Sequence, residues 1–333
     1  MKLNAIFGAH MVFAAGLPIR VYGNGKGEAE ITFASTTLKV VSDSNEWFVE
    51  FPAMEYGGPY ELKFVCGEQT IVYDDIYVGE VYLFAGQSNM QFKLKESTFD
   101  KDAYEGCDKI RLYSTERIEK ADRFTPENGW VTATKENVGD WSALGYLTSI
   151  EIAKSKGIAV GAIVCYQGAS VIESWVPTGS FERIGICLKD EDKYHDHFEP
   201  DFLDWNTDGV LYSFALSQII PFSVSSVVWY QGESDTSFEE AKIYKQELSA
   251  LIDIWRSDFA NSKLPFVIVQ IADCDSRSCD AWKLIQEHQY NIQFEKDNVK
   301  TVISADICET DDIHPPTKHI LAKRIADALI DFE

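Results

Sequence analysis

Basic residues and long hydrophobic runs are both scarce in this chain. Of its 333 residues, 30 are Lys or Arg and 53 are Asp or Glu, so the formal net charge is −23. Such a surplus of negative charge opposes binding to the phosphates of nucleic acid and to anionic lipid. The sequence also contains no stretch of about 18 or more uncharged apolar residues, which a membrane-spanning helix needs. We therefore expect neither nucleic acid nor a membrane as a partner.

Cysteines are few and scattered. The seven cysteines are an odd number and include no Cys-x-x-Cys pair, so we expect no metal site built on them. Cys165 lies within an apolar segment, where a free thiol behaves as a small hydrophobic residue. A disulfide between Cys274 and Cys279 is the alternative in an oxidising compartment, whereas the odd number favours a reducing cytoplasm.

One histidine pair has a spacing that metal sites use. His195 and His197 would lie on one face of a strand. No cysteine lies nearby and the surrounding loop is acidic, so a solvated position at the rim of a site is favoured over a metal site. The segment 176–206 around them shows little periodicity and is expected to be a long excursion near the site mouth. No cofactor is expected.

Apolar residues, by contrast, are abundant. A hydrophobic content of 45% and an aromatic content of 13% suffice for a sizeable core, and the length suggests two domains. Residues 1–76 contain short alternating runs such as 29–33 and 47–51, separated by turns. This pattern predicts a small antiparallel β-sandwich.

From residue 77 to 333 the pattern changes to alternating strands and helices. Strands are expected at 81–85, 159–166, 226–230, 265–271 and 301–305, and helices at 144–156, 208–220, 237–258 and 317–331. This order predicts a doubly wound parallel α/β sheet of the flavodoxin-like kind. Residues with reactive side chains follow several of these strands, and carboxyl ends of parallel strands meet at one edge of the sheet.

Two short segments carry chemistry, Gly86-Gln87-Ser88-Asn89-Met90 and Asp311-Asp312-Ile313-His314-Pro315. Ser88 would lie just past the end of a strand. A serine hydroxyl becomes a nucleophile when a base such as His314 takes its proton, and the base needs an orienting carboxylate, here Asp311 or Asp312. Each segment also has a simpler interpretation. The first could be an ordinary turn, and the second could be the entrance of a helix opened by Pro315-Pro316.

Five segments, in order, resemble the sialate O-acetylesterase family, which belongs to the SGNH hydrolases and is related to carbohydrate esterase family six. They are residues 79–90, 141–146, 168–175, 228–234 and 312–315 with Lys318. The resemblance spans nearly the whole chain. It implies a serine esterase that removes O-acetyl groups from a small-molecule or oligosaccharide ester, O-acetylated sialic acid first, with acetylated xylan or another acetylated sugar as alternatives. It does not indicate an oligomeric state.

The resemblance also implies roles for individual residues. The oxyanion would be bound by the amides of Ser88 and Gly168 and by the Gln231 side chain, although Gln231 could instead be a buried structural amide. Glu233 is expected to tie adjacent loops together, with proton donation as the alternative.

Two departures from the family pattern concern the same site. Ala169 stands where the family has a second glycine, and Ser170 where it has threonine. The general SGNH pattern places Asp three residues before His and sialate esterases often place it two before. This chain has both, and Asp311 is preferred because three residues give room to turn the carboxylate toward the imidazole.

Two rivals and one question of localisation stay open. A non-catalytic carbohydrate-binding protein with the same fold is the rival from another class, and a lipase or thioesterase is the rival among enzymes. Lys2 and the apolar segment 6–18 imitate a signal peptide with Ala14-Ala15-Gly16 as cleavage site. The segment 10–23 also resembles the opening strands of the family's β domain, so a structural strand and a cytoplasmic location are expected, with secretion as the alternative.

Overall fold

The computed structural model describes residues 1–118, 129–186 and 204–332. Its strands form a three-stranded sheet in the order β1-β3-β6 and an eleven-stranded sheet. β1 (Lys2–Leu3), β3 (Ile19–Asn24) and β6 (Glu46–Phe51) are antiparallel. β4 (Gly27–Phe33), β5 (Thr36–Ser42) and β7 (Gly57–Cys66) form the antiparallel edge of the larger sheet.

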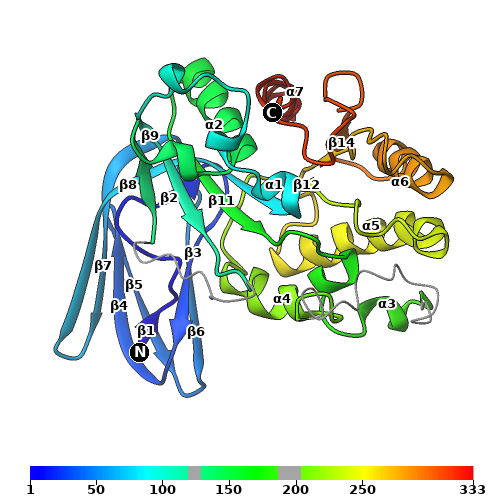
Figure 1. Cartoon of the computed structure of the whole chain (residues 1–333). Helices are drawn as coiled ribbons and strands as arrows, with labels where there is room; N and C mark the ends of the chain where they lie inside the picture. Colours follow the sequence, from blue (N-terminus) through cyan, green and yellow to red (C-terminus); the bar gives the residue numbers. More distant parts are fainter. Residues whose placement is uncertain (119–128, 187–203, 333) are drawn as a thin grey trace.

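The two antiparallel parts face each other through aromatic rings. In β6, buried and exposed residues alternate, as expected for a strand with one face on a core. The Trp47 ring of β6 stacks on Phe64 of β7 with the centroids 5.6 Å apart, and Phe33 of β4 meets Phe51 of β6 edge-on at 6.2 Å. The alternating runs of the sequence therefore form a two-layered antiparallel arrangement, at the lower left of Figure 1.

One strand belongs to both parts of the molecule. β8 (Gln69–Gly86) pairs antiparallel with β7 through its first half and parallel with β11 and β12 through its second half. Its side chains alternate between exposed and half-buried at the start and are all buried from Val78 onward, because only the second half is covered on both faces. The boundary predicted between residues 76 and 77 thus falls inside a continuous strand, and the strand predicted at 81–85 is only its end.

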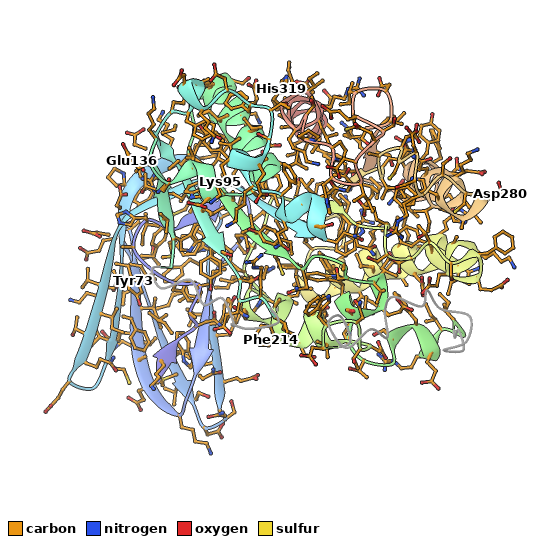
Figure 2. The ribbon with its side chains drawn as sticks, viewed as in Figure 1. Tyr73, Lys95, Glu136, Phe214, Asp280 and His319 are labelled. Carbon is orange, nitrogen blue, oxygen red and sulfur yellow. The ribbon has the colours of Figure 1, made fainter. Side chains whose placement is uncertain are left out.

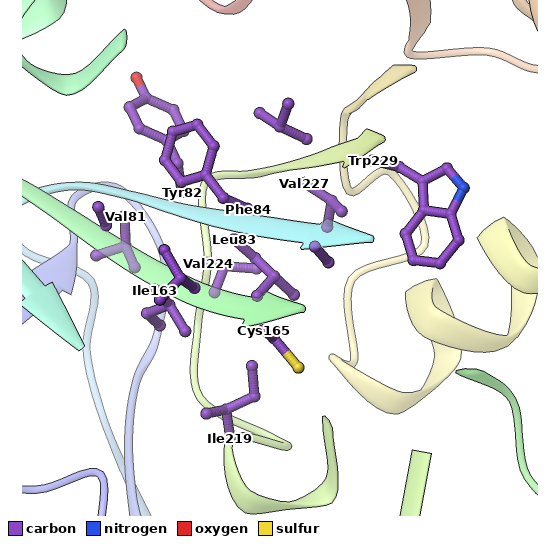
Figure 3. Packing of buried hydrophobic residues seen from close by; sticks show 14 of the residues in the cluster. Val81, Tyr82, Leu83, Phe84, Ile163, Cys165, Ile219, Val224, Val227 and Trp229 are labelled. Atoms are coloured by element: carbon purple, nitrogen blue, oxygen red, sulfur yellow. The ribbon is translucent and has the colours of Figure 1, made fainter. Parts of the chain in front are cut away.

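The rest of the large sheet is parallel and runs in the order β9-β11-β8-β12-β13-β14, with β10 antiparallel at the edge of β9. The strands are β9 (Cys107–Ser114), β10 (Val131–Ala133), β11 (Val160–Tyr166), β12 (Ser226–Tyr230), β13 (Phe266–Val269) and β14 (Val299–Val302), and β2 (Val12–Ala14) pairs with β8. Apolar side chains such as Leu83, Ile163 and Val227 fill the space beside the central strands (Figure 3).

Helices flank this sheet. They are α1 (Ser88–Gln91), α2 (Ala143–Lys156), α3 (Ser180–Arg183), α4 (Val210–Phe214), α5 (Phe238–Asp258), α6 (Asp280–Asn291) and α7 (His319–Ile330). Short 3-10 helices cover Leu94–Glu96, Lys101–Ala103, Val138–Asp140, Ile172–Trp175, Leu216–Gln218 and Ile292–Phe294. α2 and α7 lie side by side above the sheet in Figure 1. The sheet is mixed rather than wholly parallel, and the doubly wound arrangement stays a prediction.

The helix predicted at 208–220 is broken into α4 and a 3-10 helix, and β9 and α6 were not predicted. None of the helices in the described ranges is long and apolar enough to cross a membrane. The topology places β9 and β11 on one side of β8, and β12, β13 and β14 on the other. In a sheet of this kind the crevice at the carboxyl end of the first strand is the usual binding position.

Candidate active site

The turn after β8 presents Ser88 at the edge of the sheet. Gly86 has a φ of 138°, and a Cβ there would lie 2.0 Å from the carbonyl oxygen of Tyr230. Only glycine lets β8 end this close to β12. The Gln87 amide then donates to that carbonyl oxygen, and α1 begins at Ser88. As the first residue of the helix, Ser88 has an amide hydrogen that the helix itself does not bind.

A surface cavity of about 280 Å³ opens over this turn. Its lining consists of Ser88, Gln91, Phe92, Lys93, Glu96, Gly168 and His314. Gly168, which follows β11, packs so close that a methyl group added to it would lie 3.6 Å from Ser88 Cβ. The fold therefore brings three of the residues singled out in the sequence, Ser88, Gly168 and His314, to one cavity.

The Gly168 amide already has a partner in this cavity. It donates to Gln91 Oε1 at 2.9 Å. A substrate oxygen that is to use this amide has to take the place of the Gln91 side chain. The cavity thus contains an internal acceptor at the position where the sequence predicts an oxyanion.

The loop that carries His314 is held from two sides. The His314 amide donates to Asp312 Oδ1 at 2.8 Å, and the imidazole faces the Phe92 ring with the centroids 6.5 Å apart. Burial lowers the pKa of His314; the Asp312 charge raises the pKa and the Lys318 charge lowers it further. The net lowering favours the neutral imidazole, which is the form that a general base requires.

Neither predicted carboxylate touches the imidazole. Within the described residues, the only hydrogen bond between His314 and either side chain is the one that the His314 backbone amide donates to Asp312 Oδ1. Asp311 is exposed. Of the two, Asp312 is the one whose charge acts on the imidazole.

Gln231 lies away from the cavity, which corrects the expected oxyanion contact. Its side chain is fully buried, and the amide nitrogen donates to the Ser170 carbonyl at 2.9 Å and to Asp235. The side-chain oxygen accepts from the Tyr244 hydroxyl at 3.1 Å. Both amide hydrogens are used in these contacts, so the structure agrees with the alternative of a structural amide.

Asn89 and Lys318 form a buried contact that sequence reasoning assigned no role. The Asn89 amide nitrogen donates to Glu233 Oε1 at 2.6 Å and to the Ile313 carbonyl at 2.9 Å, and its oxygen accepts from Lys318 Nζ at 2.7 Å. Burial raises the pKa of Glu233 and lowers that of Lys318 to about 8. Glu233 thus contacts a neighbouring loop, as expected. Asn89 and Lys318 both lie in segments that carry the family resemblance, but their spacing alone does not place them together.

The loop after Gly168 adopts the backbone that the family's glycine would favour. Ala169 has a φ of 54°, in the left-handed region. Asn206 fixes the loop by donating from its side chain to the Ala169 carbonyl at 2.9 Å and accepting from the Val171 amide at 3.0 Å. The substitution therefore keeps the loop at some cost in backbone strain.

Other predicted features lie elsewhere. His195 and His197 belong to 187–203, outside the described residues, as does most of the predicted excursion 176–206. Cys274 and Cys279 are both free, so the alternative disulfide is not formed. Among the described residues, no group of three or more His, Cys, Asp or Glu side chains could hold a metal ion.

Similarity to known proteins settles the family. Residues 78–331 match the family described as carbohydrate esterase, sialic acid-specific acetylesterase. The chain belongs to this carbohydrate esterase family. The matched range begins within β8 and contains Ser88, Gly168, Glu233 and His314.

Relatives in this family align with most of the chain. Human sialate O-acetylesterase is 26% identical over 340 residues, which cover 90% of this chain and 62% of that protein. The mouse sialate O-acetylesterase is 23% identical over 359 residues, covering 90% of this chain and 65% of that protein. The chain thus spans less than two thirds of the length of these relatives. The crystal structure of a carbohydrate acetylesterase from Xanthomonas citri matches with a TM-score of 0.85 at 26% identity, covering 98% of this chain and 74% of that one.

Proposed function

We propose that this protein is a serine esterase that removes O-acetyl groups from a carbohydrate through an acetyl-enzyme. The observation that carries the proposal is the cavity lined together by Ser88, Gly168 and His314. Membership of a carbohydrate esterase family supports the reaction class. The lowered pKa of His314 supports its use as a base near neutral pH.

In the proposed mechanism, Ser88 Oγ attacks the acetyl carbonyl carbon while His314 takes the hydroxyl proton. The oxyanion displaces Gln91 Oε1 and accepts from the amides of Gly168 and Ser88. Collapse of the intermediate breaks the bond to the sugar oxygen, which receives the proton from His314. Water, deprotonated by the same imidazole, then attacks the acetyl-enzyme and releases acetate. Of the two exposed aspartates, Asp312 is the carboxylate proposed to stabilise the imidazolium, because its side chain bonds the His314 amide and its charge acts on the imidazole.

The cavity also supports an acidic sugar as substrate. Lys93 is a cation of its lining, and its Nζ lies 3.7 Å from Asp140 Oδ1. The same oxygen is held more closely by Lys95, at 2.7 Å, so Asp140 compensates the charge of Lys93 only in part. The Glu96 carboxylate, also in the lining, accepts from the Lys93 amide at 3.0 Å. Lys95 is labelled in Figure 2. We therefore propose O-acetylated sialic acid, which bears a carboxylate, as the first substrate to test, with acetylated xylan as the neutral alternative.

Replacement of the nucleophile tests the proposal. Ser88→Ala should reduce turnover of a short acetyl ester to less than about a hundredth of the wild-type value and leave thermal unfolding unchanged. A fluorophosphonate probe should label Ser88 in the wild-type protein and leave the variant unlabelled. Retained turnover would exclude this nucleophile, and sugar binding without any turnover by the wild type would favour the non-catalytic alternative.

The preferred length of the acyl chain distinguishes the proposed acetylesterase from a lipase or thioesterase. Hydrolysis of acetyl esters should exceed that of butyryl and longer esters, and a panel of acetylated sugars then ranks sialic acid against xylose derivatives. The same assay with a chelator tests the expectation that no metal is needed. A preference for long acyl chains contradicts the proposed substrate class.

A further inference from the structure

Asn89, the residue after the proposed nucleophile, holds three separate segments together. Its side chain is 1% exposed. The amide nitrogen bonds the Ile313 carbonyl, directly before His314, and the Glu233 carboxylate, directly after the β12 turn. The amide oxygen bonds Lys318, at the start of α7. One side chain therefore joins the turn that carries Ser88 to the loop that carries His314.

Lys318 lies beneath this contact with no exposed surface. Its ammonium group is placed over the rings of Phe92 and Tyr230, 5.0 Å and 5.7 Å from their centroids. Phe92 is also the ring that packs against the His314 imidazole. The lysine therefore touches both Asn89 and a wall of the cavity.

We propose that Asn89 and Lys318 are positioning residues for the reaction of Ser88 and His314, with Asn89 fixing the distance between their two loops and Lys318 fixing the Asn89 amide. The inference rests on the proposed function, since it assumes the roles of Ser88 and His314. It adds two residues that hold the reacting groups without touching the substrate.

A purely stabilising role explains this arrangement poorly. Burying an ammonium and a carboxylate costs free energy, and well-packed apolar side chains of the same size are often as stable. Glu233 Oε2 is buried without a hydrogen-bond partner, so the described contacts do not fully satisfy the carboxylate. Two of the three partners of Asn89, Ile313 and Lys318, belong to the segments on either side of His314.

The charges around the imidazole give the proposal a second readout. Asp312 and Glu96 act on His314 as negative charges and Lys318 as a positive one. Lys318 itself faces Cys308, Glu233, Glu309 and Asp312. Because the Lys318 charge lowers the pKa of His314, removing that charge should raise this pKa. The imidazole is then protonated, and no longer acts as a base, at a higher pH than in the wild type.

The first experiment replaces Asn89 by Asp. The new carboxylate can still accept from Lys318 but cannot donate to Ile313 or Glu233. We expect kcat to fall at least about tenfold, since small displacements of reacting groups cost that much or more, while KM changes little. Fluorophosphonate labelling of Ser88 should slow in parallel. Unchanged kcat and labelling in a folded Asn89→Asp protein overturn the role of Asn89.

The second experiment compares Lys318→Met with Lys323→Met. Lys323 lies on the same helix, is exposed and pairs with Asp327 at 3.0 Å, so it serves as the control. In Lys318→Met, kcat should fall because Asn89 loses its contact with the lysine, and the acid limb of kcat/KM against pH should move to higher pH; both should stay in place in Lys323→Met. A wild-type kcat in a folded Lys318→Met protein overturns the role of Lys318.

Thermal unfolding of each variant separates folding from positioning. If Lys318→Met does not fold, Lys318→Arg keeps the charge but alters the contact with Asn89. A lower kcat with a wild-type acid limb then supports the proposal, and wild-type kcat overturns it. Ser88→Ala serves as the reference for the proposed function: if it stays active, that function fails, whereas an inactive Ser88→Ala beside unaffected Asn89 and Lys318 variants defeats only this inference.

Discussion

At the scale of single residues, Lys93 is expected to set the preference for an acidic sugar. Lys93→Gln keeps much of the side-chain length and removes the charge. KM for O-acetylated sialic acid should rise about fivefold, because a partly exposed ion pair contributes up to about 1 kcal/mol, whereas KM for a neutral acetyl ester should stay constant. Steady-state kinetics on both substrates measure this difference. Lys101→Gln, on an exposed 3-10 helix outside the cavity lining, is the matched control, and an equal change on both substrates contradicts the assignment.

Asp312 and Asp311 are distinguished by a pair of variants. Asp312→Asn should lower kcat at least about tenfold, since it removes the charge that stabilises the imidazolium, and Asp311→Asn should do far less. The Asp312 charge raises the pKa of His314. Its loss therefore lowers that pKa and moves the acid limb of the pH profile to lower pH. The opposite order of effects on kcat would return the role to Asp311.

The residues that line the cavity were easier to predict than the contacts of their neighbours. Ser88 and His314, which share the cavity, were predicted because a serine hydroxyl needs a base to act as a nucleophile. The direction of a side-chain amide has no such signature. Gln231 points to Ser170 and Asp235 because of how the β12 turn packs, and Asn89 meets Lys318 across 229 residues of sequence. These contacts are set by tertiary packing, which a single sequence pattern does not contain.

At the scale of secondary-structure elements, the two turns beside the cavity should respond in opposite ways to small substitutions. Gly86→Ala places a methyl group against the Tyr230 carbonyl at a φ of 138°, so the free energy of unfolding should fall by about 3 kcal/mol or more. Ala169→Gly removes left-handed strain and should leave that free energy unchanged or raise it by up to about 1 kcal/mol. Urea unfolding measures both values.

The comparison of these two variants is internally controlled. Gly86 ends β8 and Ala169 lies just after β11, which are neighbouring strands of the same sheet, and both residues have positive φ angles. A stability loss in Ala169→Gly as large as that in Gly86→Ala would show that side-chain contacts, and not backbone conformation, determine these turns.

Elements were predicted well where burial alone determines them. β12 lies at Ser226–Tyr230, as expected from its uninterrupted apolar residues. β9 was missed because charged residues interrupt its apolar pattern. One of them, Arg111, is buried and bonds Asp75 of β8 at 2.9 Å. An arginine that finds its partner on another strand cannot be distinguished from a surface arginine by periodicity.

At the scale of the whole molecule, the charge of −23 should act against the proposed substrate. An anionic sugar approaches a negative protein, and salt screens this repulsion over about 10 Å at 0.1 M. The kcat/KM for O-acetylated sialic acid should therefore rise with added sodium chloride, while that for a neutral acetyl ester stays nearly constant. Initial rates at low substrate concentration over a salt series measure both. A fall for the anionic substrate would show that the local field of Lys93 outweighs the global charge.

The continuity of β8 limits how the molecule can be recombined with its relatives. Successive residues of a strand point to opposite faces, so a one-residue insertion between the two halves of β8 would invert one hydrophobic face relative to the other. Because β8 runs through both the antiparallel layers and the parallel sheet, the side-chain alternation in one part fixes which residues face the core in the other. A chimera joined within β8 should fold when an even number of residues is gained or lost, and an odd change should turn the core side of one half toward water.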